Sequence, residues 1–343
     1  MERVVITGAS GFLGSHAAQE FAAHGYAVTV AGRNAAALPR RYEQHVLDRF
    51  VGDLDALADA DLAAHPHLRA DVVVHCAALS TPWGRWSDFV NANIHGTERA
   101  WRLARRVGAR RLVHVSSPSI YAATRDFHGI REDEVDPSNR LTHYIRSKIA
   151  AEALLAARAH LSGAPEVVVL RPRGLIGRGD PSMVPRILDV HDRLGVPLFD
   201  GGRNLVDVTP VRDGARALRL AAEAGPEAAG RAFNITGGDP RPFRDLVERL
   251  LHLTGRTPRF RHLDRRVAYA AATAAEAVCT LLPHRPEPPV MRYTISTVAH
   301  SQTLDISAAR EVLGYEPAHS IDAALAEYGD TQYGDSDAQC EHA

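Results

Sequence analysis

Three evenly spaced glycines directly after the first apolar run constrain this chain most. The run ends at Thr7, and Gly8, Gly11 and Gly14 follow where a helix is expected to begin. The first glycine allows a tight turn, the second lets the backbone approach a pyrophosphate, and the third allows a helix to pack closely on a strand. The N-terminus of that helix supplies N–H donors and the positive end of the helix dipole. The segment therefore predicts a dinucleotide site formed by Gly8, Ser10, Gly11, Phe12, Leu13 and Gly14.

The first half of the chain alternates short β-branched runs with amphipathic helical stretches. This pattern is typical of βαβ units, and nearly continuous apolar runs indicate strands covered by helices on both faces. We predict an α/β fold, a doubly wound Rossmann parallel sheet with a smaller C-terminal substrate-binding lobe. The expected strands are Val4 to Thr7, Ala27 to Ala31, Asp71 to His75, Arg111 to Val115 and Glu166 to Leu170, and the expected helices are Phe12 to Ala23, Trp86 to Val107 and Thr142 to Leu161.

The chain divides by composition into three parts. Residues 1–170 are expected to form the dinucleotide-binding Rossmann domain. Residues 171–329 are punctuated by prolines and are expected to form the substrate-binding lobe, with Ala232 to Ile235 returning to the sheet as a strand. Residues 330–343 are polar without an apolar period, so we expect a disordered tail.

Composition argues against several classes of partner. Lys and Arg number 40 against 41 Asp and Glu, so the net charge of −1 provides no basic field for nucleic acid. Cys76, Cys279 and Cys340 lie far apart, and the 18 histidines are scattered, so we expect neither disulfides nor a metal site. Because the N-terminus also lacks the regions of a signal peptide, a cytoplasmic location is expected.

One Ala-rich apolar stretch, Val267 to Leu282, stands out in the second half. It is shorter than the roughly 20 residues of a spanning helix and is interrupted by polar side chains, so no membrane span is expected. We interpret it as a buried or lid helix. Contact with a membrane surface is the alternative.

The residues after the second and third strands bear on which dinucleotide binds. Gly32 and Arg33 stand where an acidic residue would bind the ribose 2′-hydroxyl of NAD, so a guanidinium is available for a 2′-phosphate. This favours NADP(H), although an Arg33 that only stacks on adenine would suit NAD(H) equally. Asp53 is placed to accept from the adenine amino group, and a helix N-cap is its alternative role.

A tyrosine and a lysine lie four residues apart near the start of an expected helix. Tyr144 and Lys148 therefore share one helical face. A phenol has a pKa near 10 in water, and an adjacent ammonium stabilises the phenolate, so we expect Lys148 to lower the Tyr144 pKa. Ser117 supplies a hydroxyl at the end of a strand, where substrates bind in doubly wound sheets. The three side chains predict an acid–base site.

Together with the glycine loop, these motifs resemble the extended short-chain dehydrogenase/reductase superfamily from Met1 to about Tyr328. The resemblance also rests on Gly52 to Leu54, His75 to Ala78, Asn93 to Thr97, Val115 to Tyr121, Tyr144 to Lys148 and Leu170 to Pro172. It implies that Ser117, four positions before Tyr121, joins Tyr144 and Lys148 as the catalytic group. It further implies a homodimer and cofactor contacts from Asp53, Leu54, Cys76, Ala77, Ala78, Asn93, Tyr144, Lys148 and Pro172.

Within the superfamily, the chain is most similar to the 3β-hydroxysteroid dehydrogenase-like branch, which includes 2-alkyl-3-oxoalkanoate reductases and sterol-4-carboxylate 3-dehydrogenases. Pro118 and Ser119 stand where related dehydratases carry Asp and Glu, and Gly174 stands where related epimerases carry Asn. The resemblance implies hydride transfer between nicotinamide and a carbonyl or alcohol of a lipophilic β-keto, β-hydroxy or steroid-like compound. The expected substrate-binding residues are Leu79, Ser80, Trp83, Leu175 and Met183.

Two other functions stay open. The first is a nucleotide-sugar epimerase with tightly bound NAD, for which Arg173, Arg203 and Arg292 could pair with a diphosphate. The second is a non-catalytic protein on the same fold. Because such proteins lose the catalytic tyrosine and lysine, the presence of Tyr144 and Lys148 disfavours it.

Overall fold

A seven-stranded parallel sheet forms the centre of the computed structural model, which describes residues 1–32, 38, 47–51 and 69–329. The strands follow the order β12-β7-β5-β4-β1-β2-β3, so the chain winds outward in both directions from the β1–β4 pair. Ligands bind at such a switch point, beyond the carboxyl ends of the strands. The strands are β1 (Arg3–Thr7), β2 (Ala27–Gly32), β3 (Leu47–Val51), β4 (Val72–His75), β5 (Arg111–Val115), β7 (Glu166–Pro172) and β12 (Ala232–Ile235).

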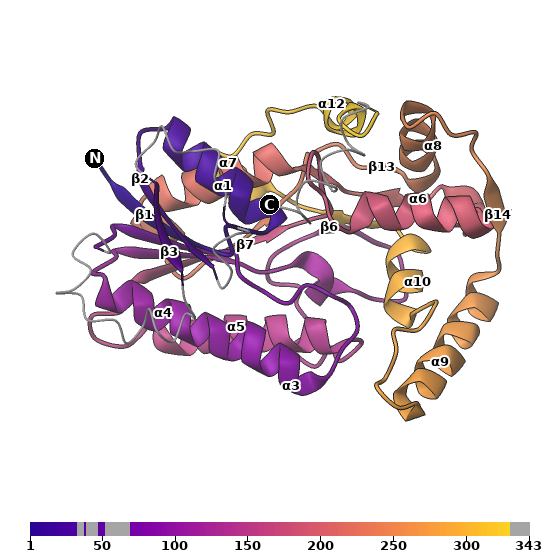
Figure 1. Ribbon diagram of the computed structural model, residues 1–343, viewed down its shortest axis with the longest axis horizontal. Coiled ribbons are helices and arrows are strands. Elements are labelled where there is room, and N and C mark those ends of the chain that lie inside the picture. Colours follow the sequence, from indigo (N-terminus) through magenta and orange to yellow (C-terminus); the bar gives the residue numbers. More distant parts are fainter. Residues whose placement is uncertain (33–37, 39–46, 52–68, 330–343) are drawn as a thin grey trace.

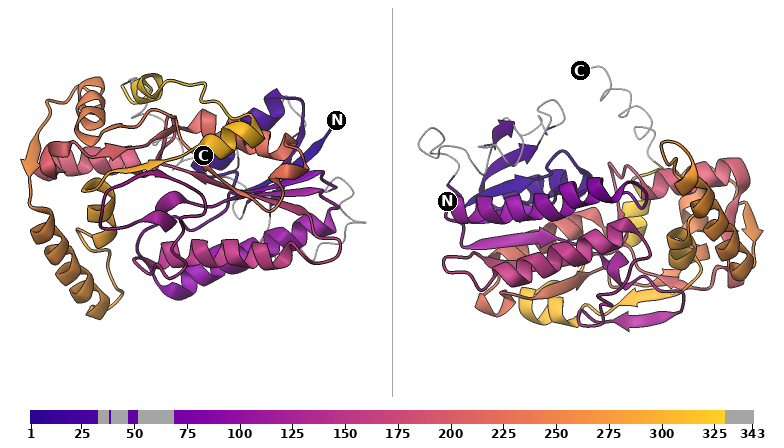
Figure 2. Two further views of the ribbon diagram at one scale, coloured as in Figure 1. Left: turned by 180° about the vertical axis from the view of Figure 1, so that it is seen from behind. Right: turned by 90° about the horizontal axis from the view of Figure 1, so that it is seen from below.

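Helices cover both faces of this sheet, as the alternation of the sequence predicts (Figure 1). Helices α1 (Phe12–Ala23) and α7 (Val211–Glu223) pack on the face to which Ile6 points. Helices α4 (Gly96–Arg106) and α5 (His143–Arg158) lie side by side on the opposite face, to which Val5 points (Figure 2). Neighbouring residues of one strand therefore serve two separate cores, which explains the continuous apolar runs.

The expected helix from Trp86 to Val107 is continuous but irregular. It begins as α3 (Trp86–Phe89), widens into a π-helix, η3 (Val90–His95), and continues as α4. The Thr97 hydroxyl donates to the Asn93 carbonyl at 2.6 Å inside the widened turn. Single π turns inside α-helices are frequent at functional sites.

A smaller lobe lies beyond one end of the sheet (Figure 1). Its helices are α6 (Met183–Leu194), α8 (Phe243–Leu253), α9 (Arg265–Leu281), α10 (Arg292–Val298) and α12 (Ile321–Ala326), while α11 (Ser307–Leu313) packs on α7 and β12. Its short strands are β6 (Phe127–Ile130), β8 (Leu175–Ile176), β9 (Val196–Leu198), β10 (Leu205–Val206), β11 (Thr209–Pro210), β13 (Arg241–Pro242), β14 (Phe260–His262) and β15 (Gln302–Leu304).

Helix α9 contains the apolar stretch that the sequence singles out. Only Ala272 and Cys279 of this helix are buried, while Val267 is 69% and Leu281 86% exposed. The interpretation as a fully buried helix is therefore wrong, and the lid interpretation fits better. Across the described part of the chain, no helix is both long and apolar enough to cross a membrane.

Gly14 provides a test of the contact between helix and glycine loop. A Cβ at Gly14 would lie 2.2 Å from the Gly8 carbonyl oxygen and 3.0 Å from the Ala9 Cα, so the backbone would have to move. We expect Gly14→Ala to lower the free energy of unfolding by about 1–3 kcal/mol in urea denaturation. Gly96→Ala is the matched control, because a Cβ there would meet only the Asn91 carbonyl oxygen at 3.8 Å. Equal stability of the two variants would contradict this packing.

Candidate active site

The glycine loop lies at the switch point, against the segment that follows β4. Gly8 has a φ of +72°, and a Cβ there would lie 2.6 Å from the backbone nitrogen of Ala77. The loop can therefore approach Cys76 and Ala77 only because residue 8 is glycine. The Gly8 N–H donates to the Ala31 carbonyl at 3.1 Å, which ties the loop to β2 as well.

Helix α1 begins at Phe12 with Gly11 as its N-cap, and no side chain caps it. Its first N–H groups, including those of Phe12 and Leu13, are therefore available to an anion. Ser10 lies beside the end of β2, 3.8 Å from where a Gly32 Cβ would stand. The loop thus fits a dinucleotide pyrophosphate. The predicted contacts Arg33, Asp53 and Leu54 lie outside the described residues.

Lys148 is the only lysine in the sequence. The other residues among the 40 Lys and Arg are all arginine. Its side chain is 2% exposed, and Nζ donates to the Val115 carbonyl, at the end of β5, at 2.9 Å. Burial lowers the Lys148 pKa to about 8, an effect that the neighbouring Glu152 carboxylate partly offsets. Arginine could not respond in this way, because a guanidinium stays protonated in proteins.

Tyr144 lies one helical turn before Lys148 on α5, and the Ser117 hydroxyl is its hydrogen-bonding neighbour. Burial raises the Tyr144 pKa to about 12, and Ser117 offsets part of this rise. The expected lowering of this pKa is therefore wrong for the protein alone. Removal of the phenol from water outweighs the Ser117 hydrogen bond, and the Lys148 ammonium is bonded to the Val115 carbonyl instead.

Of the three serines in this segment, Ser117 is the hydrogen-bonding neighbour of the Tyr144 hydroxyl. Ser117 caps the short helix η4 (Pro118–Tyr121), accepts from the Ser119 N–H at 3.2 Å and shares a hydrogen bond of 2.6 Å with the Ser119 hydroxyl. Ser119 therefore holds Ser117 in place. The Ser116 hydroxyl is buried and has no hydrogen-bond partner among the described residues.

Asn93 links the loop after β4 to the first turn of α5. Its Oδ1 accepts from the Leu79 N–H at 2.7 Å, and its Nδ2 donates to the Leu79 carbonyl at 3.0 Å and to the Ser147 hydroxyl at 2.8 Å. The Ser147 hydroxyl donates in turn to the Tyr144 carbonyl at 2.7 Å. Asn93 is 1% exposed, so its hydrogen bonds brace the residues around Tyr144 from inside the protein.

A second buried network holds α5 against the end of β7, where Pro172 is the last residue. Glu152 accepts from Arg171 through both oxygens, at 3.0 and 2.6 Å. Arg171 also donates to the Tyr121 hydroxyl, which donates to the Asn234 Oδ1 of β12 at 3.0 Å. These charge-assisted bonds fix the position of α5 along the strands of the sheet, and therefore also the position of Lys148.

Sequence reasoning missed Tyr293 at the site and gave Arg173 a role only in the alternative function. Tyr293 of α10 is a hydrogen-bonding neighbour of Ser119 and interacts electrostatically with Tyr144 and Arg173. Arg173 directly follows β7 and is 8% exposed. Tyr293 has no motif around it and lies far from Tyr144 in sequence, so no local signal could have found it.

A hollow of about 360 Å³ lies beside Trp83 and is of a size that small-molecule sites use. Its lining includes Trp83, His143, Ala277 and Met291, so α9 faces it as a lid would. The other predicted substrate residues do not line it. Leu175 and Met183 instead pack against core clusters, while Leu79 is held by Asn93 and Ser80 is exposed.

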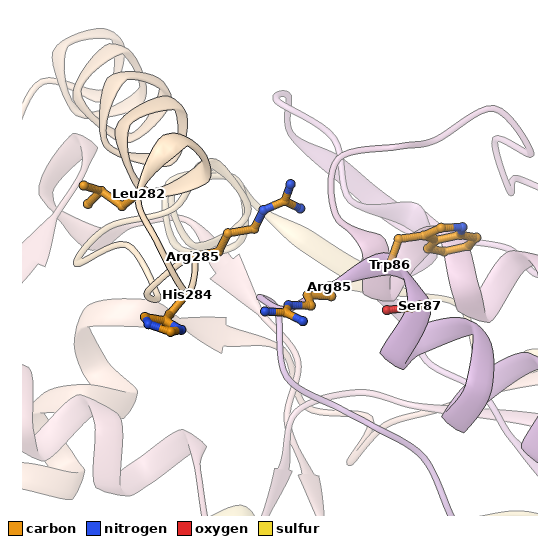
Figure 3. Close-up of a pocket in the computed structure, with 6 residues that line it drawn as sticks. All are labelled: Arg85, Trp86, Ser87, Leu282, His284 and Arg285. Carbon is orange, nitrogen blue, oxygen red and sulfur yellow. The ribbon is translucent and has the colours of Figure 1, made fainter.

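A second, more open hollow of about 470 Å³ lies between the start of α3 and the chain after α9 (Figure 3). Its lining residues are Arg85, Trp86, Ser87, Leu282, His284 and Arg285. The Arg285 carbonyl accepts from the Trp83 Nε1–H at 2.9 Å, which joins this rim to the Trp83 loop. Among the described residues, no group of His, Cys, Asp and Glu side chains could hold a metal ion.

Comparison with known proteins agrees with this geometry. The model of the family "NAD dependent epimerase/dehydratase family" matches residues 4–236. A 2-alkyl-3-oxoalkanoate reductase of Stenotrophomonas maltophilia is 31% identical over 329 residues, 94% of this chain and 97% of that protein. A sterol-4-alpha-carboxylate 3-dehydrogenase (decarboxylating) of Mus musculus is 27% identical, over 94% of this chain and 89% of that protein.

Solved structures show the same fold. The structure of MoeE5 in complex with UDP-glucose and NAD superposes with a TM-score of 0.73 at 25% identity, covering 98% of this chain and 99% of that one. The family model spans about two thirds of the chain. The matched region includes the glycine loop, Asn93, Tyr144 and Lys148. The chain belongs to the NAD dependent epimerase/dehydratase family and, within it, to the extended short-chain dehydrogenase/reductases.

Proposed function

We propose that this protein reduces a lipophilic β-keto acid or ester with NADPH, and that it oxidises the β-hydroxy compound in the reverse direction. The observation that carries the proposal is the meeting of Ser117, Tyr144 and Lys148 at the carboxyl edge of the sheet, next to the glycine loop. A bound nicotinamide supplies or accepts the hydride. The protein must supply the proton and stabilise the charge on oxygen.

Tyr144 is suited to give the proton. Because its pKa is about 12, the phenol is protonated at neutral pH and can donate to a carbonyl oxygen as negative charge develops there. Ser117 donates a hydrogen bond to the same oxygen, and Ser119 fixes the Ser117 hydroxyl at 2.6 Å. Lys148 would hold the cofactor ribose, and its pKa of about 8 lets it exchange protons near neutral pH.

Gly174 supports a substrate other than a sugar nucleotide. Its φ is +51°, and a Cβ there would lie 3.1 Å from the Asp207 carbonyl oxygen. A side chain at this position would therefore crowd the Asp207 carbonyl, and glycine offers no side chain with which to hold a nucleotide diphosphate. The relation to a 2-alkyl-3-oxoalkanoate reductase favours a β-keto acyl compound, and the hollow at Trp83 could take its apolar chain. The epimerase alternative rests on the likeness to MoeE5.

We expect Tyr144→Phe to lower kcat by about 10²-fold or more while cofactor affinity stays nearly unchanged, because only the acidic hydroxyl is lost. Steady-state kinetics and a cofactor titration measure the two effects. Tyr26→Phe is the control, since the Tyr26 hydroxyl donates to Glu223 at the C-terminal end of α7 and has no contact with Ser117 or Lys148. Turnover close to wild type in Tyr144→Phe would remove Tyr144 from the reaction.

The preference for NADPH rests on Arg33, which directly follows the last residue of β2 in the sequence. We expect Arg33→Ala to weaken NADPH binding by about 1–2 kcal/mol, because a charge-assisted contact with the 2′-phosphate is lost, and to leave NADH binding almost unchanged. Fluorescence titration with both nucleotides measures this difference. If the wild type binds NADH more tightly than NADPH, the proposed preference for NADPH is wrong. The proposed substrate class is not affected by that result.

A substrate panel tests the reaction itself. The panel holds β-keto acids and esters, 3-hydroxysteroids and UDP-sugars, each with NADPH or NADP⁺ as the direction requires. We expect turnover of the β-keto compounds, followed by absorbance of the nicotinamide. Conversion of a UDP-sugar without added cofactor would establish the epimerase instead.

We also propose a homodimer formed through α4 and α5. These helices lie side by side on one face of the molecule, and two copies could pair across a twofold axis (Figure 2). Light scattering at micromolar concentration should give twice the mass of the 37.2 kDa chain. A monomeric mass would contradict the pairing.

A further inference from the structure

Arg173 is a buried arginine whose guanidinium has no bonding partner among the described residues. Among the residues whose burial the structure describes, it is one of three buried arginines, and the other two are fully engaged. Arg111 bonds to Glu166 and to carbonyls after α7, while Arg171 bonds to Glu152, Tyr121 and the Glu132 carbonyl. No hydrogen bond or ion pair of the described chain ends on the Arg173 side chain, which is 8% exposed. A buried cation without such partners requires an explanation.

The backbone places Arg173 at the active edge of the sheet. Its N–H donates to the Ile235 carbonyl at 2.9 Å, and its carbonyl accepts from the Thr209 hydroxyl, so the residue is fixed directly after Pro172. Its side chain interacts electrostatically with Tyr293 and Asp207. Tyr293 neighbours Ser119, and Ser119 shares its 2.6 Å bond with Ser117. A line of hydroxyl groups therefore runs from Tyr144 toward Arg173.

We propose that the Arg173 guanidinium binds the carboxylate of the substrate, so that the protein takes a β-keto acid as its anion in preference to an ester or a neutral steroid. This inference rests on the proposed reduction and defines its substrate class. In a β-keto acid, one carbon separates the carboxylate from the reacting carbonyl. A carboxylate held by Arg173 and Tyr293 leaves that carbonyl near Ser117 and Tyr144.

The local charge favours a single carboxylate over a diphosphate. Asp207 lies near Arg173, and its pKa, raised by burial to about 6, leaves it mostly ionised at neutral pH. Little net positive charge is then available for a polyanion. The other candidates for pairing a diphosphate are engaged or distant, because Arg292 bonds to Glu276 at 2.7 Å and Arg203 is exposed. A guanidinium fork matches the two oxygens of one carboxylate.

The decisive comparison uses a medium-chain β-keto acid and its methyl ester, with wild type, Arg173→Gln and the exposed control Arg203→Gln. We expect Arg173→Gln to lower kcat/KM for the acid by about 10²-fold and for the ester by less than about threefold, because only the acid loses a buried charge partner. Arg173→Lys should recover part of the loss. Equal losses for acid and ester would overturn the assignment.

Stability separates this role from a structural one. Removing Arg173 should lower the melting temperature only slightly, since no hydrogen bond or ion pair is lost and only the longer-range attraction to Asp207 disappears. Arg171→Met should lower it, because Glu152 is left unpaired. A large fall for Arg173→Gln would indicate a structural arginine and contradict the proposal.

Binding measured without turnover keeps the two proposals distinguishable. In calorimetry, the matching β-hydroxy acid should bind more weakly to Arg173→Gln than to wild type. Its methyl ester should bind equally to both. If neither β-keto compound is reduced but the hydroxy acid binds through Arg173, the proposed reaction fails and the carboxylate site stands. If the hydroxy acid does not bind, or if UDP binds through Arg173 instead, the carboxylate site is wrong.

Discussion

The burial of one ammonium group, that of Lys148, is the constraint on which the rest of the site depends. A charge removed from water is costly unless bonded, and here the Val115 carbonyl at the end of β5 accepts from it. That bond requires α5 to lie at a fixed height on the sheet. The Glu152–Arg171 pair holds that height, and the Asn93–Ser147 bond holds the first turn, which carries Tyr144. All other Lys or Arg positions in the sequence are arginine. Lysine therefore occurs only at the position where burial can bring the pKa of a basic group close to neutrality.

The parts of the fold that follow local rules could be predicted from the sequence. The six expected strands and α1 are present within two residues of their predicted ends, because apolar runs and glycine spacing are local signals. Features that depend on long-range packing could not be predicted. Three such features are the π turn at Asn93, the position of Tyr293 beside Ser119 and the exposure of α9. Each depends on how segments distant in the sequence pack against one another. The sign of the Tyr144 pKa shift was missed because sequence shows the neighbouring lysine but not the depth of burial.

The site has two chemically different ends. At one end Arg173 and Asp207 are buried beside the half-buried Tyr293. The hollow at Trp83 is more open and is lined by Ala277 and Met291 as well as by charged side chains such as Glu276. The proposed β-keto acid has a carboxylate that would suit the first end and an apolar chain that would suit the second. The two ends differ because they come from different parts of the fold. Arg173 directly follows β7 at the carboxyl edge of the main sheet, whereas α9, which lines the hollow, belongs to the smaller lobe.

The most direct test of the central claim is the titration of Lys148 itself. Protein grown with ¹³C-labelled lysine should give one lysine Cε resonance by NMR, because the sequence contains a single lysine. The chemical shift is followed without nucleotide from about pH 6 to about pH 11, a range that includes both the ordinary and the lowered lysine pKa. The account predicts a midpoint at about 8, the value that burial gives this ammonium. A midpoint at the ordinary lysine value of 10.5 would contradict it.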